Sequence, residues 1–119
     1  MKAAAFDYHR PESRAEALQL ARSLENAKFL AGGQSLVAML NMRYAIVDDL
    51  IDLNRVPDLA GISFDGDVLR VGAMTRQKDL KSDSALLRRA PIFATALDYV
   101  GHLQTRNRGT LGGSLCHLD

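Results

Sequence analysis

Two glycine pairs, Gly32-Gly33 and Gly112-Gly113, constrain the fold of this chain more than any other feature. Each pair follows a segment expected to be extended, precedes an expected helix or turn, and has a serine one or two residues later. Without a Cβ atom, consecutive backbone N–H groups can turn toward one anion and let it approach closely. The pairs therefore predict two loops that could hold two phosphates of one dinucleotide. The alternative, a tight turn or a close packing point, is the more common reason for any single glycine pair.

The residues that flank the glycine pairs indicate which kinds of phosphate site are possible. If a helix begins at Ser35, its free N–H groups add the positive end of a helix dipole to the first loop. Neither pair forms G-x-G-x-x-G or G-x-x-x-x-G-K-[ST], so the Rossmann and P-loop modes of nucleotide binding are not supported. Arg106 and Arg108 precede the second pair, where they could neutralise phosphate or, equally, form structural salt bridges or hold the loop.

Hydrophobic periodicity and capping signals predict a mixed α and β chain in two small lobes, residues 1–54 and 55–119. In the first lobe we expect strands at 3–8, 28–31 and 49–53. We also expect a helix at 14–24 that begins with a Ser13/Glu16 capping box. A further helix after Gly33 is apolar all round and is therefore expected to be buried. In the second lobe we expect a hairpin with strands 61–64 and 68–73 and a turn at Asp65-Gly66. After the hairpin we expect a helix at 76–81 capped by Thr75, a second helix cap at 82–84, and a helix at 91–100 that ends at Gly101.

The other polar side chains do not form a catalytic or metal-binding pattern. The three histidines lack metal-ligand spacing, and no general acid/base pair is evident, so a cofactor must carry any reaction. Cys116 is expected to be a buried, inert thiol. Three clustered aspartates are expected to be solvated: Asp48, Asp49 and Asp52.

Composition argues against several other functions. The chain has 15 Lys and Arg against 14 Asp and Glu, and a net charge of +1 argues against nucleic-acid binding. One cysteine cannot ligate an iron–sulfur cluster built from this chain alone. No apolar run approaches the roughly 18–20 residues of a membrane helix, and the N-terminus carries no secretory signal. We therefore expect a cytoplasmic protein with no transmembrane segment.

Four segments, 29–36, 50–53, 71–75 and 105–115, together resemble one family. Their order and spacing, with the paired A-G-G-Q-S-L and R-N-R-G-T-L-G-G-S motifs, resemble the FAD-binding medium subunit of molybdenum hydroxylases, in the carbon monoxide dehydrogenase and xanthine dehydrogenase family. The resemblance implies an α+β FAD-binding domain of the vanillyl-alcohol-oxidase type, with two lobes and the FAD pyrophosphate between them. Family members continue for well over a hundred further residues, so it also implies a second lobe that is incomplete here.

The resemblance implies a set of FAD-binding residues and no catalytic or metal-ligating ones. The first loop would be Ala31, Gly32, Gly33, Gln34 and Ser35, and the second Thr110, Leu111, Gly112, Gly113 and Ser114, with Asp119 as an acidic residue near the cofactor.

The resemblance also implies the role of an oxidoreductase flavoprotein component. A large molybdopterin-containing subunit would oxidise the substrate, and a small subunit with 2Fe–2S clusters would pass the electrons to FAD and on to an external acceptor. Two alternatives stay open: a truncated, non-catalytic fragment, and a nucleotide-binding module without redox chemistry.

Overall fold

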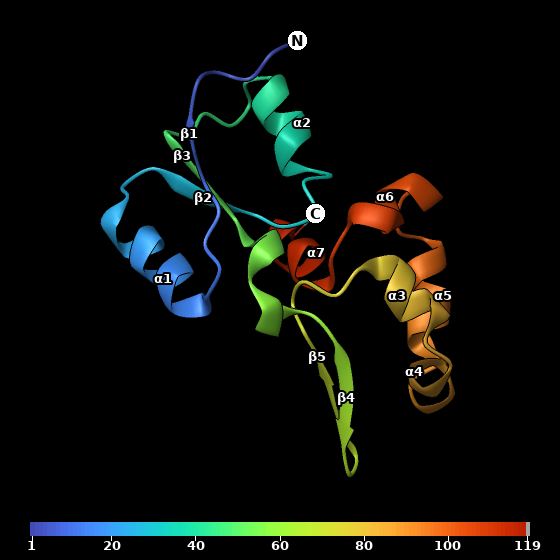
Figure 1. Cartoon of the computed structure of the whole chain (residues 1–119). Coiled ribbons are helices and arrows are strands. Elements are labelled where there is room, and N and C mark those ends of the chain that lie inside the picture. The colour runs from blue at the N-terminus through green and yellow to red at the C-terminus, as the bar shows by residue number, and fades with distance from the viewer. Residues whose placement is uncertain (119) are drawn as a thin grey trace. The chain divides into compact units, whose positions relative to one another are not determined.

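The computed structural model describes residues 1–118, and Asp119 lies outside the described residues. The chain divides into two compact units, Met1–Asp58 and Leu59–Asp119, each with its own hydrophobic core (Figure 1). Both units combine helices and strands, so the predicted mixed α and β class is confirmed.

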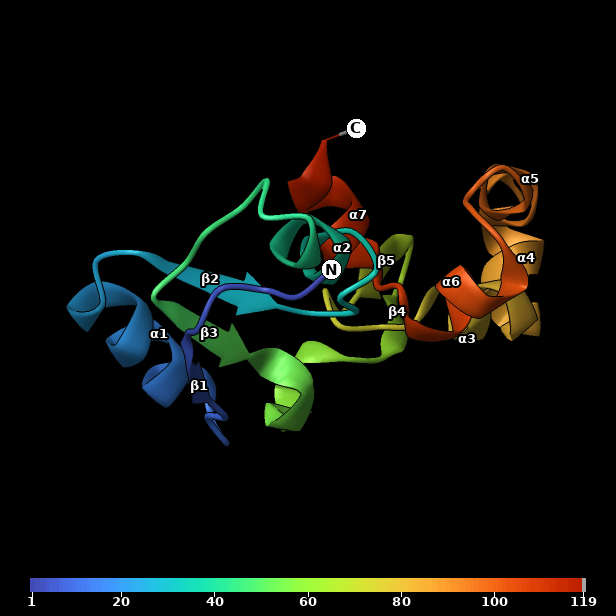
Figure 2. The ribbon, with the colours of Figure 1, turned by 90° about the horizontal axis from the view of Figure 1, so that it is seen from above.

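The first unit is a three-stranded parallel sheet with a helix in each crossover. It contains β1 (Asp7–His9), α1 (Arg14–Ser23), β2 (Ala27–Leu30), α2 (Leu36–Asn41) and β3 (Asp49–Asp52), followed by short 3-10 turns at Leu53–Arg55 and Pro57–Leu59. The strand order is β1-β3-β2. The two crossovers run across the sheet in opposite directions and both are expected to be right-handed, which places α1 and α2 on opposite faces (Figure 2).

Alternation along β3 distributes its side chains between those faces. Leu50, 2% exposed, packs with Leu40 of α2 and with Val47 in the core of this unit. Ile51, 1% exposed, points to the other face because neighbouring strand residues alternate. A central strand buried on both faces thus carries the aspartate, Asp52, that ends it at the edge of the first glycine loop.

The N-terminal cap of α1 confirms the predicted helix, with one difference in the capping box. Ser13 Oγ accepts a hydrogen bond from the Glu16 N–H at 3.2 Å, as expected. The Glu16 carboxylate accepts from the N–H of Glu12, at 2.8 Å, rather than from that of Ser13. The helix spans Arg14–Ser23, close to the predicted 14–24.

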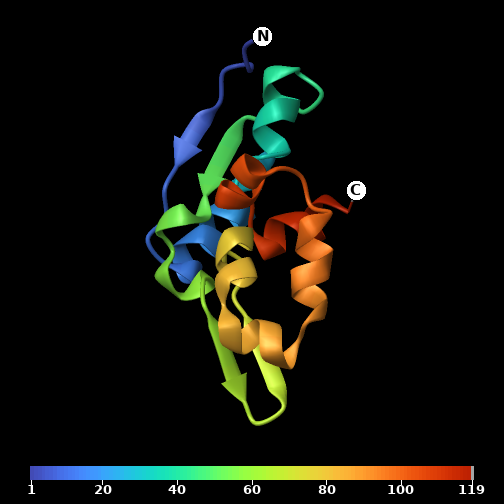
Figure 3. The same cartoon turned by 90° about the vertical axis from the view of Figure 1, so that its right-hand side faces the viewer.

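The second unit packs a β-hairpin against several short helices (Figure 3). It contains β4 (Ile62–Asp65), β5 (Val68–Val71), α3 (Gln77–Ser82), α4 (Ser84–Arg89), α5 (Ile92–Asp98), α6 (Leu103–Arg108) and α7 (Leu111–His117). One hairpin face packs against three buried leucines, Leu80, Leu86 and Leu97. Because Asp65 pairs with Val68, the turn residues are Gly66 and Asp67, one position later than predicted.

Several local predictions were wrong because longer-range contacts decided them. β1 is Asp7–His9 rather than 3–8, since Phe6 and Ala3 pack into the core instead of pairing. The helix after Gly33 is not buried all round: in α2 only Leu40 is buried, Val37 is 40% exposed, and Met42, which follows the helix, is 48% exposed.

Thr75 does not cap α3. Its hydroxyl accepts from the Gly61 N–H at 2.9 Å and donates to the Gly61 carbonyl at 3.1 Å, which ties the start of the hairpin to its end. Asp83 does cap α4, accepting from the Leu86 N–H at 2.7 Å. The helix predicted at 91–100 is the shorter α5, followed by Gly101 at φ +50°.

The predictions did not separate the last sixteen residues into helices. Residues 103–117 form α6 and α7, with Gly109 and Thr110 between them. Among residues 1–118, no helix has the length and apolar character that crossing a membrane requires.

Candidate functional site

The first glycine loop, residues 31–35, connects β2 to α2 in the first unit. Gly33 has φ +73°, a left-handed conformation that side chains disfavour. A Cβ at this position would lie 3.1 Å from Val37 Cγ2 and 3.3 Å from Leu30 Cδ1. The Gly33 carbonyl accepts from the Val37 N–H at 3.2 Å, so the loop turns directly into the helix. The glycine is therefore needed for backbone conformation and for space.

The same loop presents backbone N–H groups that the described residues leave without an acceptor. These are the N–H groups of Gly33, Gln34, Ser35 and Leu36. Ser35, at the N-cap of α2, forms no capping hydrogen bond with its side chain. The Gln34 side chain bends back instead, its Nε2 donating to the Gly32 carbonyl at 3.3 Å. Neighbouring free donors beside a left-handed glycine are the arrangement that binds an anionic oxygen.

A hydrogen-bond network around the buried Asp52 holds the start of this loop. Asn54 Nδ2 donates to the Ala31 carbonyl at 3.0 Å and also to Asp52 Oδ1. Asp52 Oδ1 further accepts from the Asn54 N–H at 2.9 Å, and Asp52 Oδ2 accepts from the hydroxyl of Tyr8. These contacts link β1 and the end of β3 to the first glycine loop.

The expectation that Asp48, Asp49 and Asp52 are solvated is wrong for Asp52, which is 6% exposed. Burial acts to raise the pKa of this carboxyl, but the hydrogen bonds from Tyr8 and Asn54 outweigh burial, and the pKa lies below its usual value. The hydrogen bond to Asp52 in turn raises the pKa of the Tyr8 phenol. The other two aspartates also have partners, His9 Nε2 at 2.6 Å from Asp49 and Asn26 Nδ2 at 3.1 Å from Asp48.

The second glycine loop, residues 110–114, lies in the second unit and differs from the first in its backbone. The sequence predicted that Gly112 and Gly113 would precede a helix or turn. Instead, both glycines lie in the first turn of α7. Thr110, 1% exposed, caps this helix, its Oγ1 accepting from the Gly113 N–H at 3.0 Å. The N–H groups of Leu111 and Gly112 donate to the carbonyls of Thr75 and Ala73, at 3.1 and 2.8 Å. These N–H groups are therefore occupied by the protein itself.

Gly112 is a close packing point. A Cβ there would lie 2.7 Å from Ala73 Cβ and 2.8 Å from the Ala73 carbonyl oxygen. The backbone of α7 thus approaches the segment after β5 more closely than any side chain allows. In this loop Ser114 is exposed, and its Oγ accepts a hydrogen bond from Gln77 Nε2 at 2.7 Å.

Two residues that contact these loops, Asn54 and Gln77, were not predicted. Asn54 follows Asp52 by two residues, the spacing at which an aspartate side chain accepts from the backbone, so this signal was present. Gln77 precedes Leu80 by three residues on the core face of α3, and a polar residue on an apolar face was the available signal.

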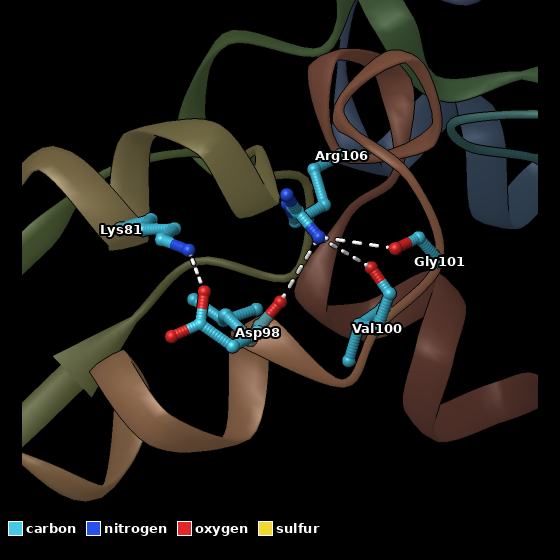
Figure 4. Close-up of polar contacts among 6 residues, drawn as sticks. Lys81, Asp98, Val100, Gly101 and Arg106 are labelled. Carbon is cyan, nitrogen blue, oxygen red and sulfur yellow. Dashed lines mark hydrogen bonds and ion pairs between the residues drawn. The ribbon is translucent and has the colours of Figure 1, made fainter.

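Arg106 is a structural residue in the second unit. Its Nη1 donates to the carbonyls of Leu97, Val100 and Gly101, at 3.3, 3.1 and 3.1 Å, and so caps the C-terminal end of α5 (Figure 4). Beside it Lys81 pairs with Asp98. Of the two alternatives left open for Arg106, the contacts favour the structural one.

The remaining candidates do not gather into a site. Cys116 is exposed, not buried as expected, because α7 presents it to solvent. Within residues 1–118 no group of three or more His, Cys, Asp or Glu side chains could hold a metal ion. The prediction for Asp119 falls outside the described residues.

Comparison with known proteins relates the chain to one family over nearly its whole length. Residues 4–119 match the family described as the FAD binding domain in molybdopterin dehydrogenase. The carbon monoxide dehydrogenase medium chain of Hydrogenophaga pseudoflava is 44% identical over 113 residues, 94% of this chain and 39% of that protein. The 6-hydroxypseudooxynicotine dehydrogenase complex subunit alpha of Paenarthrobacter nicotinovorans is 43% identical over 120 residues, 100% of this chain and 40% of that protein.

Solved structures extend the similarity to the fold. Carbon monoxide dehydrogenase from H. pseudoflava, in a form lacking the Mo-pyranopterin moiety of its molybdenum cofactor, superimposes with a TM-score of 0.97 at 43% identity, covering 100% of this chain and 42% of that one. Quinoline 2-oxidoreductase from Pseudomonas putida 86 gives 0.96 at 41% identity, covering 100% and 42%. The chain spans about 40% of the length of these relatives.

Proposed function

The chain belongs to the family of FAD-binding domains of molybdopterin dehydrogenases, and from this membership we propose that it is the FAD-binding part of the flavoprotein subunit of a molybdenum hydroxylase. In this role electrons from 2Fe–2S clusters reach the FAD held by the chain and leave to an external acceptor. Relatives named as a medium chain and as a subunit of a dehydrogenase complex support this role.

The observation that carries the proposal is the first glycine loop. Its free N–H groups, from Gly33 to Leu36, and the left-handed turn at Gly33 fit a phosphate oxygen of FAD. The whole loop is proposed to contact the cofactor: Ala31, Gly32, Gly33, Gln34 and Ser35. The donors are fixed before the cofactor arrives, because Asn54 holds the Ala31 carbonyl and Val37 holds that of Gly33. A preorganised loop binds with less loss of conformational entropy.

The second glycine loop is proposed to contact FAD through different groups. Its residues are Thr110, Leu111, Gly112, Gly113 and Ser114, and the N–H groups of Leu111 and Gly112 already have protein acceptors. Its exposed polar side chain is that of Ser114, whose hydroxyl accepts from Gln77 Nε2 and keeps its own proton for the cofactor, and its helical glycines offer a surface without side chains. Asp119 stays a proposed neighbour of the cofactor.

Bound FAD would supply the redox chemistry, since it can take up two electrons and release them singly. The residues described above supply binding and orientation, and none of them is proposed to transfer a proton. The proposed partners are a large molybdopterin-containing subunit and a small subunit carrying the 2Fe–2S clusters.

The test is to express the full-length subunit with and without those partner subunits. The purified subunit should show the visible absorption of bound flavin, release FAD on denaturation, and co-purify with the iron–sulfur and molybdopterin subunits when they are present. A colourless protein that binds ADP but not FAD would indicate a nucleotide-binding module instead. Reduction of the flavin by a small substrate with no partner present would contradict the electron-relay role.

A further inference from the structure

Gln77 is a buried polar side chain with only one end satisfied. It is the first residue of α3 and is 3% exposed. Its Nε2 donates to Ser114 Oγ at 2.7 Å, but Oε1 has no hydrogen-bond partner among residues 1–118. An amide that leaves a buried oxygen unpaired lowers stability relative to an apolar side chain of the same shape. Stability alone therefore does not explain a glutamine at this position.

The surroundings of Gln77 hold its amide in one place. The Gln77 N–H donates to the Gly109 carbonyl at 2.9 Å, which anchors the backbone. Gly109 passes directly over the side chain, since a Cβ on it would lie 2.7 Å from Gln77 Oε1 and 3.0 Å from Cδ. The amide is thus enclosed on the Gly109 side and meets Ser114 with its nitrogen.

This contact determines what the Ser114 hydroxyl can do. An amide nitrogen only donates, so Ser114 Oγ acts as the acceptor and its own proton is not used in the contact. Ser114 Oγ donates no hydrogen bond to the described residues, and Ser114 is exposed, so its proton is available to a group outside the protein. The hydroxyl is therefore oriented to donate outward from the second glycine loop.

We propose that Gln77 is a positioning residue that fixes the Ser114 hydroxyl as a hydrogen-bond donor to an acceptor oxygen of FAD. The inference rests on the proposed function and names a contact in the second glycine loop that does not involve the occupied N–H groups. Gln77 itself does not touch the cofactor. It acts by setting the direction of one hydrogen bond.

The experiment measures the FAD dissociation constant of the full-length apo-subunit for wild type, Ser114→Ala, Gln77→Met and Gln77→Glu. Ser114→Ala removes the donor, and Gln77→Met fills the same space without orienting Ser114. Both should weaken FAD binding, Ser114→Ala by about tenfold and Gln77→Met by less. Ser114→Ala also leaves Gln77 Nε2 without a partner and should lower stability, so the double variant Ser114→Ala/Gln77→Met, which contains no unpaired amide, tests the donor separately from folding.

Gln77→Glu supplies a readout that a structural role would not give. A buried carboxyl has a raised pKa. Below that pKa the protonated acid can donate to Ser114 as the amide does, whereas above it the carboxylate accepts the Ser114 proton and withdraws it from FAD. The affinity of Gln77→Glu should therefore match wild type at about pH 5 and fall by about tenfold or more toward about pH 9, relative to wild type at each pH.

Two controls separate hydroxyl orientation from simple charge repulsion. In a Ser114→Ala background, Gln77→Glu should add no further pH dependence, because the hydroxyl is gone. Gln104→Glu, an exposed substitution on α6, adds the same charge and should behave as wild type.

The possible outcomes are distinguishable. If wild type binds FAD and Ser114→Ala binds it equally well, or if the pH dependence of Gln77→Glu persists without Ser114, the inference is wrong while the proposed function stands. If the Glu variant binds like wild type at every pH, Ser114 accepts rather than donates, and the inference is also wrong. If wild type does not bind FAD at all, the proposed function itself fails.

Discussion

At Gly33 the backbone is left-handed and there is little space for a side chain, and Gly66, which is left-handed but open, allows the two effects to be separated. An alanine at φ +73° is strained by about 1–2 kcal/mol, and its Cβ would press on Val37 at 3.1 Å. Gly66, at φ +56° with nothing within 4 Å of a Cβ, carries similar strain without the contact. We predict that Gly33→Ala and Gly66→Ala both lower the free energy of unfolding, but that only Gly33→Ala reduces FAD retention, by tenfold or more in the dissociation constant. Equal flavin content in the two variants would contradict the role of the first glycine loop.

Gly112 is a less specific probe than Gly33. A side chain there would meet Ala73 backbone and Cβ within 2.8 Å, so something must shift. Gly112→Val is therefore expected to lower the stability of the second unit itself, and a loss of FAD in that variant would not by itself identify a cofactor contact.

Asp52 predicts a specific dependence of stability on pH. The hydrogen bonds from Tyr8 and Asn54 hold the pKa of Asp52 in the folded protein below its usual value, so folding favours the ionised form. The ionised Asp52 contributes its full share of the free energy of unfolding above about pH 4. This contribution is lost as the pH falls through the lower pKa that Asp52 has in the folded protein. Asp52→Asn removes an acceptor from the Tyr8–Asn54 network and should cost about 1–3 kcal/mol near neutral pH.

The measurement is urea unfolding of wild type and Asp52→Asn near pH 7 and near pH 3. The difference between them should shrink in acid, because the wild type loses its advantage there. Asp58→Asn is the matched control, since the side chain of Asp58 is 72% exposed and its contact with Arg14 is 3.8 Å long. A pH-independent difference for Asp52→Asn would contradict the assignment.

The end of α5 depends on one guanidinium. Arg106 donates to three carbonyls in the last turn of α5 and just after it, those of Leu97, Val100 and Gly101. We predict that Arg106→Met lowers the free energy of unfolding by about 1–3 kcal/mol while leaving the FAD dissociation constant and its salt dependence unchanged. Arg108→Met, whose side chain is exposed, is the comparison variant. If Arg106→Met weakened FAD binding without loss of stability, Arg106 would be a phosphate ligand after all.

The two glycine pairs show how similar sequence patterns can serve different structural purposes. Gly33 turns the chain between a strand and a helix and leaves its neighbours' N–H groups free. Gly112 lies inside the first turn of α7 and allows close packing on Ala73. The difference depends on which segment packs against each pair, and the pattern Gly-Gly contains no information about that segment.

Residues 1–119 by themselves are predicted to bind FAD weakly or not at all. β4 and β5 form a two-stranded sheet, which has no neighbouring strand among the described residues and is held by helix packing on one face. Several large apolar side chains are more than half exposed, among them Tyr44, Ile46, Ile92, Tyr99, Leu103, Leu115 and Leu118. Exposed apolar surface of this kind favours aggregation or association with partners. Isothermal titration of residues 1–119 with FAD is the measurement, with the full-length subunit as control.

A monomeric, cooperatively unfolding fragment that binds one FAD with micromolar or tighter affinity would contradict this prediction. It would show that residues 1–119 hold both glycine loops in their binding geometry without further support. Aggregation of the fragment, or FAD binding only when partner subunits are added, is the expected result.

The amino-acid sequence by itself determined the features that depend on neighbouring residues. The Ser13 cap and its helix, the hairpin with alternating Ile62 and Phe64, and a left-handed Gly33 loop before a helix all follow from contacts within a few positions. Family membership was also predicted from the sequence, and residues 4–119 match that family.

Tertiary structure decided everything that depends on which distant segments meet. No local pattern specifies the parallel strand order β1-β3-β2. The hydrogen bonds of Tyr8 with Asp52 and of Gln77 with Ser114 join residues 37 or more positions apart. Hydrophobic burial is non-directional, so a sequence pattern shows that a face is buried without showing against what. The partners of buried polar groups, and hence the functions of Asn54, Gln77 and Arg106, became visible only in the folded chain.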